Sequence, residues 1–479
     1  MRTLRSASIA VLSLAMVAGV QAGARATSPA RAMGVAALLA RPVGSNVNVS
    51  RMAGNQSENT IAIDPTNPNR IAVTSNLENA SGLFHGWSTD GGATWQTDII
   101  ADGGGLGFAC CDSSMVADNY GNFFLTYLAS SVYVALSTDG GATFTRIAAI
   151  KPEGGVPHRG PRAGKPGYSR LPNGDQPSIT AGNGEVWVTW TSFSTGAVQA
   201  AGAAVSGLGQ VGPFSAAENA QGAGDGDYGD VAIGPDGEVM VVYQNPTGGE
   251  GPASIYTDLD PDGLGPQGFQ PAKLTQVTNV GGFDYIPAQA GRSVDAETEF
   301  AWDRTGGAHN GRLYLLYTSE FPQESNDMDI QVMYTDDDGT TWSSPVRVND
   351  DSGTNSQFNP RIALDPTTGF IALSWYDCRN DLGTHGPGDT NGIPNDDAMV
   401  YGAVSKNGGV SFLPNLRVAA RPSNSADAQN GIDFGDYEGL AYYGGNFYPL
   451  WADNSNSTHD NPDGTLHELD IYTAKVHVH

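Results

Sequence analysis

The chain has 479 residues, a formal net charge of −27 and only three cysteines. Its acidity excludes nucleic acid as an expected partner, because contact with phosphates needs clustered lysine and arginine. With so few cysteines, a buried core rather than a disulfide scaffold must hold the protein together. The length allows two or three ordinary domains or one large repeat domain. The 63 glycines and 28 prolines favour many short strands joined by turns, with almost no helix.

The first residues are typical of an export signal. Two arginines stand within the first five residues, an apolar run covers residues 7–20, and small residues follow at Ala22 and Ala26. The run is short for a membrane span, so a signal peptide over residues 1–26 is favoured over an anchoring helix. Cleavage there would remove three arginines and no acid, which changes the net charge from −27 to −30. Residues 27–45, rich in Ala, Pro and Gly, are expected to be a disordered lead-in. The mature protein is therefore predicted to be secreted, extracellular or periplasmic, without a membrane span.

A short turn motif, Ser/Thr-x-Asp-x-Gly-x-Thr-Trp/Phe, is repeated along the chain. Its Asp side chain is expected to accept backbone N–H groups in a tight turn, and its Gly supplies a conformation with positive φ. The aromatic residue then starts the next strand with its ring in the core. A turn that recurs between strands predicts a repeat architecture. The copies occupy residues 88–95, 137–144, 335–342 and, in a degenerate form, 405–412.

A pair of consecutive strands recurs more often than the turn motif, and it predicts seven repeats. The pairs cover residues 59–64 and 70–75, 113–118 and 123–127, 177–181 and 185–190, 230–234 and 238–243, 299–303 and 312–317, 360–365 and 370–375, and 438–443 and 446–451. The seventh repeat lacks a fourth strand, which residues 46–50 could supply, so that the two ends of the chain close the ring. We therefore predict an all-β, seven-bladed β-propeller over residues 46–479, with six blades and an irregular tail as the alternative.

The turn motif is the Asp box, and the pattern resembles the sialidase (neuraminidase) superfamily of β-propellers, which usually have six blades. That resemblance implies three arginines that hold a substrate carboxylate, a Tyr–Glu nucleophilic pair and an Asp acid/base. Bidentate pairing of arginine with carboxylate is the physical reason for the arginines. Carried over to this chain, the substrate-binding residues would be Arg361 and Arg379, with Arg162 or Arg170 as the third. The family's arginine motif near the first blade has no clean counterpart here.

In a propeller the box turns lie on one rim, and the loops that enter the innermost strands gather around the axis on the opposite face, where binding and catalysis are expected. Nearly every repeat brings an acid or amide to that position. Like charges so close require either protonation of some acids or a bound cation. The alternative is that these side chains cap backbone N–H groups of neighbouring loops. They are Glu58, Asp112, Asp175, Gln176, Asp227, Tyr228, Glu297, Glu299, Asn359, Asp436, Tyr437 and Glu438.

From this ring the predicted catalytic residues are Tyr437, Glu438, Asp112 and Glu299. Tyr437 and Glu438 are the residue types of the family's nucleophilic pair. Neighbouring residues of a strand point to opposite faces, however, so these two cannot simply act as a couple.

Two further features concern metals and thiols. Asp258, Asp260 and Asp262 copy the opening of a calcium loop, although Phe269 stands where a bidentate Glu is expected, so a structural turn is the alternative. Among the cysteines at 110, 111 and 378, the two neighbours could pair with each other, or either could pair with Cys378.

The favoured function is a secreted, monomeric exo-glycosidase that acts on terminal acidic sugars of an extracellular glycan, ahead of a polysaccharide lyase on the same scaffold. The alternative is a non-catalytic propeller that binds a glycan or a protein partner, and in one version of it calcium stabilises the scaffold. The sequence does not name the sugar.

Overall fold

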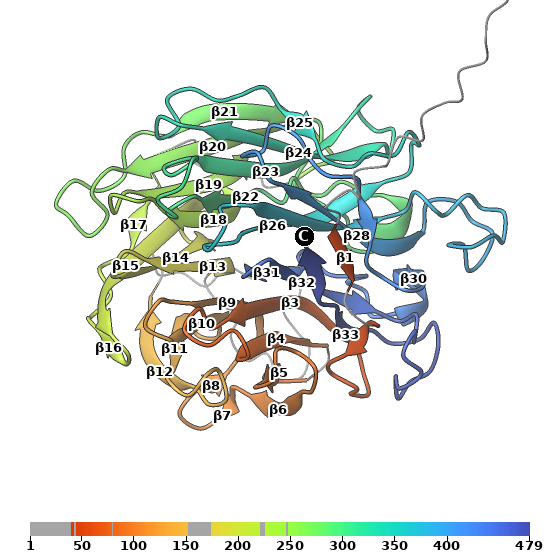
Figure 1. The fold of residues 1–479 in the computed structure, drawn as a ribbon, viewed down its shortest axis with the longest axis horizontal. Coiled ribbons are helices and arrows are strands. Elements are labelled where there is room, and N and C mark those ends of the chain that lie inside the picture. Colours follow the sequence, from red (N-terminus) through yellow and green to blue (C-terminus); the bar gives the residue numbers. More distant parts are fainter. Residues whose placement is uncertain (1–39, 43–44, 79, 152–173, 221–225, 246–247) are drawn as a thin grey trace, which may run out of the picture. The chain divides into compact units, whose positions relative to one another are not determined.

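Seven antiparallel sheets of four to six strands surround one axis in the computed structural model (Figure 1). The structure describes residues 40–42, 45–78, 80–151, 174–220, 226–245 and 248–479. The first strand of each sheet is innermost and packs beside the first strands of its neighbours, and the last of these inner strands contacts the first. This is the predicted seven-bladed β-propeller.

The first four blades follow the chain without interruption. Blade one is β3 (Gln56–Ile63), β4 (Ile71–Leu77), β5 (Leu83–Ser88) and β6 (Gln96–Ile100). Blade two is β9 (Cys111–Ala117), β10 (Phe123–Leu128), β11 (Val132–Ser137) and β12 (Thr145–Ile150). Blade three is β13 (Gly174–Gly182), β14 (Glu185–Ser192) and β15 (Ala197–Gly207), edged by β16 (Gln210–Val211) and β17 (Glu218–Asn219). Blade four is β18 (Asp227–Ile233), β19 (Val239–Asn245), β20 (Ala253–Asp260) and β21 (Lys273–Thr278).

The last three blades repeat the plan, with the seventh completed from the N-terminal side. Blade five is β22 (Glu299–Trp302), β23 (Leu313–Glu320), β24 (Met328–Thr335) and β25 (Val346–Arg347). Blade six is β26 (Gln357–Leu364), β27 (Ile371–Asp377), β28 (Asp397–Ser405), β29 (Leu416–Arg417) and β30 (Ser423–Asn424). Blade seven is β31 (Gly439–Tyr443), β32 (Asn446–Asp453), β33 (Asp470–Thr473), β34 (Val476–Val478), β2 (Val47–Asn48) and β1 (Ala40–Pro42). A small hairpin, β7 (Asp102–Gly103) and β8 (Gly107–Phe108), stands apart from the blades.

Helix is nearly absent from the described residues, as the composition predicts. Two 3-10 turns, η1 (Pro287–Gln289) and η2 (Ser425–Ala428), are the helical elements of these ranges. No helix within them is long and apolar enough to cross a membrane. The core lies between the sheets, where Trp187, Trp190, Trp375 and Trp451 are fully buried. Large rings suit this place because twisted sheets that pack face to face leave wide gaps between them.

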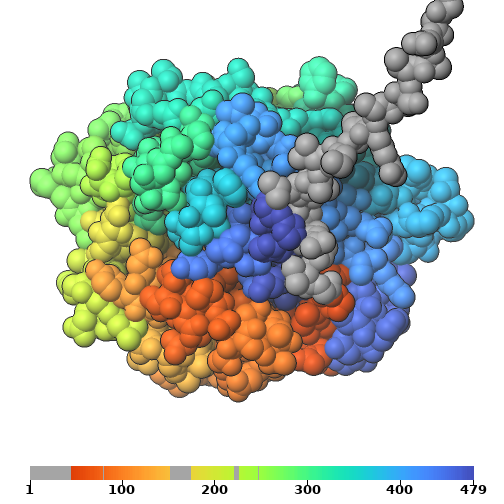
Figure 2. Space-filling view, viewed as in Figure 1, coloured from red at the N-terminus to blue at the C-terminus, as the bar shows by residue number. Residues whose placement is uncertain are grey.

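The two ends of the chain close the ring, as predicted for residues 46–50. Strand β2 pairs with β33, with Val47 opposite Thr473 and Asn48 opposite Tyr472. Figure 2 shows the orange surface of the first blade directly beside the blue surface of the last. Within the predicted lead-in, β1 pairs with β34. The predicted signal peptide, residues 1–26, lies outside the described residues.

Each box turn connects the third and fourth strands of its blade. In the first copy Asp90 accepts hydrogen bonds from the backbone N–H and the hydroxyl of Thr94, at 2.9 and 2.6 Å. The degenerate copy keeps the geometry with Asn407, which accepts the N–H of Ser411 at 3.0 Å. The boxes therefore lie at the ends of the blades away from the start of the inner strands, and they act locally in the fold.

Asp470 ties the closing strand to blade seven. Its carboxylate accepts the side chains of Asn48 at 2.5 Å and Ser50 at 3.0 Å and the backbone N–H of Met52 at 3.3 Å. The side chain is buried, so its loss leaves donors without partners.

We expect Asp470→Ala to lower the free energy of unfolding by about 2–4 kcal/mol, because several buried donors lose one acceptor. The exposed Asp98→Ala, on the outer strand of blade one, is the control and should cost under about 0.5 kcal/mol. Urea unfolding measures both. Equal stability of the two variants would contradict the role of Asp470 in ring closure.

Candidate active site at the start of the inner strands

Six of the seven blades carry a non-glycine residue in the left-handed conformation near the start of the inner strand. Such a residue costs about 1 kcal/mol or more, and it persists only where the surroundings impose it. In five blades the pairing with the second strand shifts register at this point, which marks a bulge. The residues and their φ angles are Glu58 (52°), Asp112 (56°), Gln176 (38°), Tyr228 (55°), Glu297 (40°) and Asn359 (46°).

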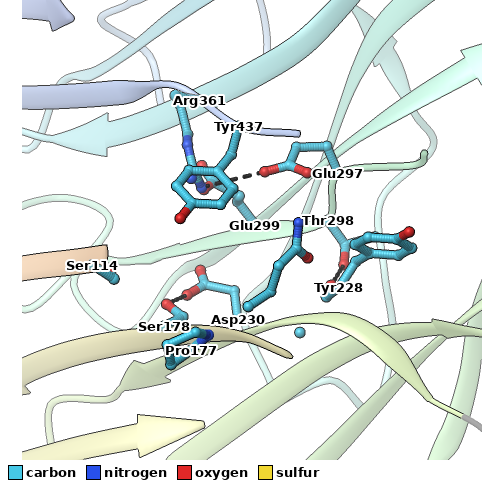
Figure 3. A pocket seen from close by; sticks show the side chains of 12 residues that line it. Ser114, Pro177, Ser178, Tyr228, Asp230, Glu297, Thr298, Glu299, Arg361 and Tyr437 are labelled. Carbon is cyan, nitrogen blue, oxygen red and sulfur yellow. Dashed lines mark hydrogen bonds and ion pairs between the residues drawn. The ribbon is translucent and has the colours of Figure 1, made fainter. Parts of the chain in front are cut away.

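These bulges surround a small cavity on the axis, with a volume of about 50 Å³ (Figure 3). Its lining comes from six of the blades and is polar, with several ionisable side chains. The residues are Ser114, Gln176, Pro177, Ser178, Tyr228, Gly229, Asp230, Glu297, Thr298, Glu299, Arg361 and Tyr437.

Arg361 is the cation of this lining, and two carboxyl groups converge on it. Its Nη1 forms an ion pair with Glu299 and lies 3.5 Å from Oε1 of Glu297. Its Nε donates to the backbone carbonyl of Glu438. The guanidinium lies over the ring of Tyr437, 5.1 Å from the ring centre, as Figure 3 shows. Of the predicted site residues, the structure thus brings Glu299, Arg361 and Tyr437 together.

A second group faces Arg361 from blades three and four. The Ser178 hydroxyl donates to Asp230 at 2.5 Å, and the other carboxylate oxygen of Asp230 accepts the backbone N–H of Phe300 at 2.8 Å. Tyr228 donates its phenol hydrogen to the carbonyl of Gly282 at 3.0 Å.

Several of the axial side chains cap the next blade, as the alternative interpretation of the sequence expects. Glu299 accepts the N–H of Ile362 at 3.1 Å, and Asp112 accepts that of Gln176 at 3.4 Å. The backbone groups freed by the bulges thus find acceptors in side chains of the neighbouring blade. The polar ring is therefore part of the scaffold as well as of the cavity wall.

Burial raises the pKa values of the axial acids. It raises the pKa of Glu297 to about 8, against the opposing charge of Arg361. It also raises the pKa values of Asp175 and Asp227 to about 6. Burial and the charge of Asp436 raise the pKa of Glu58 well above its ordinary value. At neutral pH part of the ring therefore carries protons, which relieves the repulsion expected from the sequence.

Arg292, which the sequence analysis missed, supplies a second positive charge to the ring. Its Nε donates to Asp436 at 2.6 Å and its Nη2 pairs with the same carboxylate, while Glu58 lies 4.0 Å away. Asp230 and Ser178 were likewise not singled out. Because arginine and lysine are scarce in this chain, Arg292 could have been considered as a site residue. It lies in a long loop, however, and no periodic pattern aligns that loop with the other repeats.

Glu438 is turned away from the cavity. Its carboxylate accepts the side chain of Asn59 at 2.7 Å and the backbone N–H of Ala452 at 3.5 Å. Burial raises the pKa of Glu438 to about 8. Tyr437, but not Glu438, belongs to the described cavity lining, so the two do not act there as a couple.

Arg379 lies in a separate network of blade six. It donates to Asp377 at 2.9 Å, to Asp350 at 2.7 Å and to Asn415 at 2.9 Å, and it stacks on Tyr401 at 4.4 Å. The cavity lining, as far as the structure describes it, does not include this arginine. Arg162 and Arg170 lie outside the described residues.

Two of the three candidate calcium residues accept hydrogen bonds within a turn. Asp260 accepts the N–H groups of Asp262 and Gly263, both at 3.1 Å, and Asp262 accepts that of Gln267 at 3.2 Å. Asp258 is buried on β20. Within the described ranges, the acids close enough to share an ion are instead Asp381, Asp396 and Asp397 of blade six.

The cysteines pair as neighbours. Cys110 and Cys111 are bonded just before Asp112, and Cys378 is free and buried.

Comparison with known proteins gives similarity to solved structures only. No protein-family model matches the chain, and no curated protein does. A protein of unknown function from Dyadobacter fermentans is 12% identical, over 92% of this chain and 99% of that one, with a TM-score of 0.46. The α-L-arabinofuranosidase of Fusarium graminearum is 11% identical, over 91% and 98%, with a TM-score of 0.44. The sialidase of Trypanosoma rangeli is 11% identical, over 91% and 58%, with a TM-score of 0.39. At scores this low, the assignment of the fold rests on the sheet topology itself.

The raised pKa values of Glu297 and Glu438 predict that the protein is more stable in mild acid. Both carboxyl groups bind protons more tightly in the folded than in the unfolded chain. The free energy of unfolding should therefore be highest near the unfolded pKa values and fall as the pH rises toward about 8. Thermal unfolding between about pH 5 and pH 8 measures the slope. In Glu297→Gln, the free energy of unfolding that is lost over this pH range should be smaller than in the wild type by an amount on the order of 1–3 kcal/mol. An unchanged pH dependence would contradict the raised pKa of Glu297.

Arg379→Ala should act on stability. It leaves the buried carboxylate of Asp377 without its cation, which costs about 3 kcal/mol. Arg347→Ala is the matched control, because Arg347 pairs with Asp329 at 3.2 Å while its own side chain is 42% exposed. An exposed pair is worth under about 1 kcal/mol. Urea unfolding compares the two variants, and equal losses would show that Arg379 does not hold a buried charge.

Proposed function

We propose that this chain is an exported exo-glycosidase whose active site is the axial cavity. The observation that carries the proposal is that two carboxyl groups of one blade converge on Arg361 in different electrostatic states. Glu299 is ion-paired with Arg361, and burial raises the pKa of Glu297 to about 8. Glycoside hydrolysis needs this combination, one carboxylic acid and one carboxylate on either side of the scissile bond.

In this proposal Glu297 is the general acid. Its proton passes to the glycosidic oxygen as the bond to the anomeric carbon breaks, and Glu299 stabilises the positive charge that develops on the sugar. A water molecule then adds to the anomeric carbon, and the proton that it loses returns to Glu297. Tyr437 binds the sugar face with its ring. Burial and the charges of Asp112 and Glu58 raise the pKa of Tyr437 well above its ordinary value, so its phenol is a poor nucleophile at neutral pH.

The volume of the cavity favours action at a chain end. About 50 Å³ holds one or two water molecules but no sugar ring, so the ring must bind at the mouth with its scissile bond facing inward. An acidic sugar additionally requires Arg361 to exchange Glu299 for the substrate carboxylate. A neutral sugar avoids that exchange and the repulsion of the surrounding acids.

The same small volume favours a second candidate, a non-catalytic propeller that binds a glycan or a protein partner. In that case the axial acids serve only as caps between the blades. Turnover distinguishes the two candidates.

We expect release of fluorophore from at least one member of a panel of 4-methylumbelliferyl glycosides of neutral and acidic sugars. Glu297→Gln and Glu299→Gln should each lower kcat by about 10²–10⁴-fold, because the acid or the carboxylate is lost. Asp98→Asn, on an exposed outer strand, is the control and should leave kcat unchanged. For the wild type, kcat should fall above about pH 8, as Glu297 loses its proton. No turnover on any member, with intact folding and glycan binding, would favour the non-catalytic candidate.

A further inference from the structure

Three aspartates stand at the mouth of the axial cavity, where the sugar ring of a substrate must bind because a cavity of about 50 Å³ has no room for it. The cavity lining includes Gln176, Tyr228 and Tyr437, and an aspartate directly precedes each of them in the sequence. All three aspartates are half-buried, so none of them is closed off from solvent. These mouth aspartates are Asp175, Asp227 and Asp436.

The mouth aspartates carry negative charge at neutral pH. Burial raises the pKa values of Asp175 and Asp227 to about 6, which leaves most of each carboxyl group ionised at about pH 7. The carboxylate of Asp436 accepts two hydrogen bonds from the guanidinium of Arg292. Within the part of the chain that the structure describes, one arginine thus offsets only one of the three negative charges.

Both arginines that the structure describes at this end of the axis are already bound to carboxylates. Arg292 pairs with Asp436, whose side chain is 12% exposed. Arg361 pairs with Glu299, whose side chain is 9% exposed. The carboxylate of an acidic sugar would have to displace one of these acids, which would then stay largely buried without its cation. It would also face the mouth aspartates at short range, so the site resists a sugar carboxylate in two ways.

Hydroxyl groups suit the same surroundings, because a hydroxyl group can donate to a carboxylate. The hydroxyl of Thr191 already donates to Oδ1 of Asp227 at 2.5 Å. The backbone N–H groups of Gln176 and Tyr228 donate to Oδ1 of Asp175 and of Asp227, both at 3.1 Å. A carboxylate has about four sites that accept hydrogen bonds, so both aspartates keep the capacity to accept a hydroxyl group of a ligand.

We propose that the axial site takes a neutral sugar, whose hydroxyl groups donate to Asp175 and Asp227, and discriminates against sugars that carry a carboxylate. This inference rests on the proposed function and adds the class of its substrate. It differs from what the family resemblance implies, namely arginines that hold a substrate carboxylate. Asp175 and Asp227 thereby determine specificity, while Glu297 and Glu299 act on the scissile bond.

Matched pairs of 4-methylumbelliferyl glycosides test the inference, because a glucoside and a glucuronide, or a galactoside and a galacturonide, differ only at C6. With the full chain at about pH 7, we expect kcat/KM to be at least about 100-fold higher for the neutral member of any pair that is hydrolysed, since like charges at short range repel. Equal values, or a higher value for the acidic member, would overturn the inference while the proposed function would stand.

Variants assign the discrimination to the two aspartates. Asp227→Asn removes a charge and keeps a hydrogen-bonding side chain of the same size, so the neutral-to-acidic ratio of kcat/KM should fall at least about tenfold. Asp175→Asn should act in the same direction. Asp98→Asn removes an exposed charge from the outer strand of blade one and is the control, in which the ratio should not change. Unchanged ratios in both mouth variants, or an equal fall in Asp98→Asn, would contradict the roles of Asp175 and Asp227.

Binding separates this inference from the proposed function. An array of neutral and acid-terminated oligosaccharides, measured with the full chain, decides the inference without turnover. We expect binding to neutral ends to be at least about tenfold tighter than binding to uronate or sialate ends. If nothing is hydrolysed but this preference is found, the proposed function fails alone. Preference for acidic ends, or no binding to any oligosaccharide, would overturn the inference.

Discussion

Hydrogen bonds from the backbone of one blade to a side chain of the preceding blade are the interaction on which the polar end of the axis depends. Inner strands of neighbouring blades do not pair as a sheet, so N–H groups freed by the bulges need side-chain acceptors. Asp112, Asp230 and Glu299 serve in this way. Each of them must then sit near the axis, where its own charge is poorly solvated. The acidic ring is thus a consequence of how the blades are joined.

The buried carboxyl groups avoid an uncompensated charge in two ways, and both occur beside the cavity. Some acids pair with arginine, as Glu299 does with Arg361 and Asp436 with Arg292. Others keep a proton, since burial raises the pKa of Glu297 to about 8. Acid–base catalysis uses the same two states. A scaffold that must bury acids in both forms therefore already contains the components of a hydrolytic site.

The repeats could be predicted from sequence because each blade carries local signals, namely a turn of Gly, Asn or Asp and an aromatic residue in the second strand. Residues 46–50 could be assigned because one repeat lacked a strand. The arginines were harder, since the partners of Arg379 include Asp350 and Asn415, which are distant in sequence and belong to irregular segments. The calcium-like run of aspartates was difficult for the same reason. The spacing of the residues does not show whether a carboxylate, such as that of Asp260, already accepts backbone N–H groups in place of an ion.

The difference between the two ends of the axis follows from where the backbone is irregular. At the start of the inner strands the bulges leave donors that only nearby side chains can satisfy, so polar residues line the axis. At the far end each inner strand enters a tight turn, and in blade two the donors of that turn are satisfied within the hairpin, since Asp118 accepts from Tyr120 and Asn122. In blade seven they are satisfied from the neighbouring blade, since Asp365 of blade six accepts the N–H groups of Gly444 and Gly445. Arg304 likewise joins two blades at that end, because it reaches from blade five to the carbonyl of Ala181 in blade three. Side chains thus join blades at both ends of the axis, and the start of the inner strands differs by the larger number of ionisable side chains in its cavity lining.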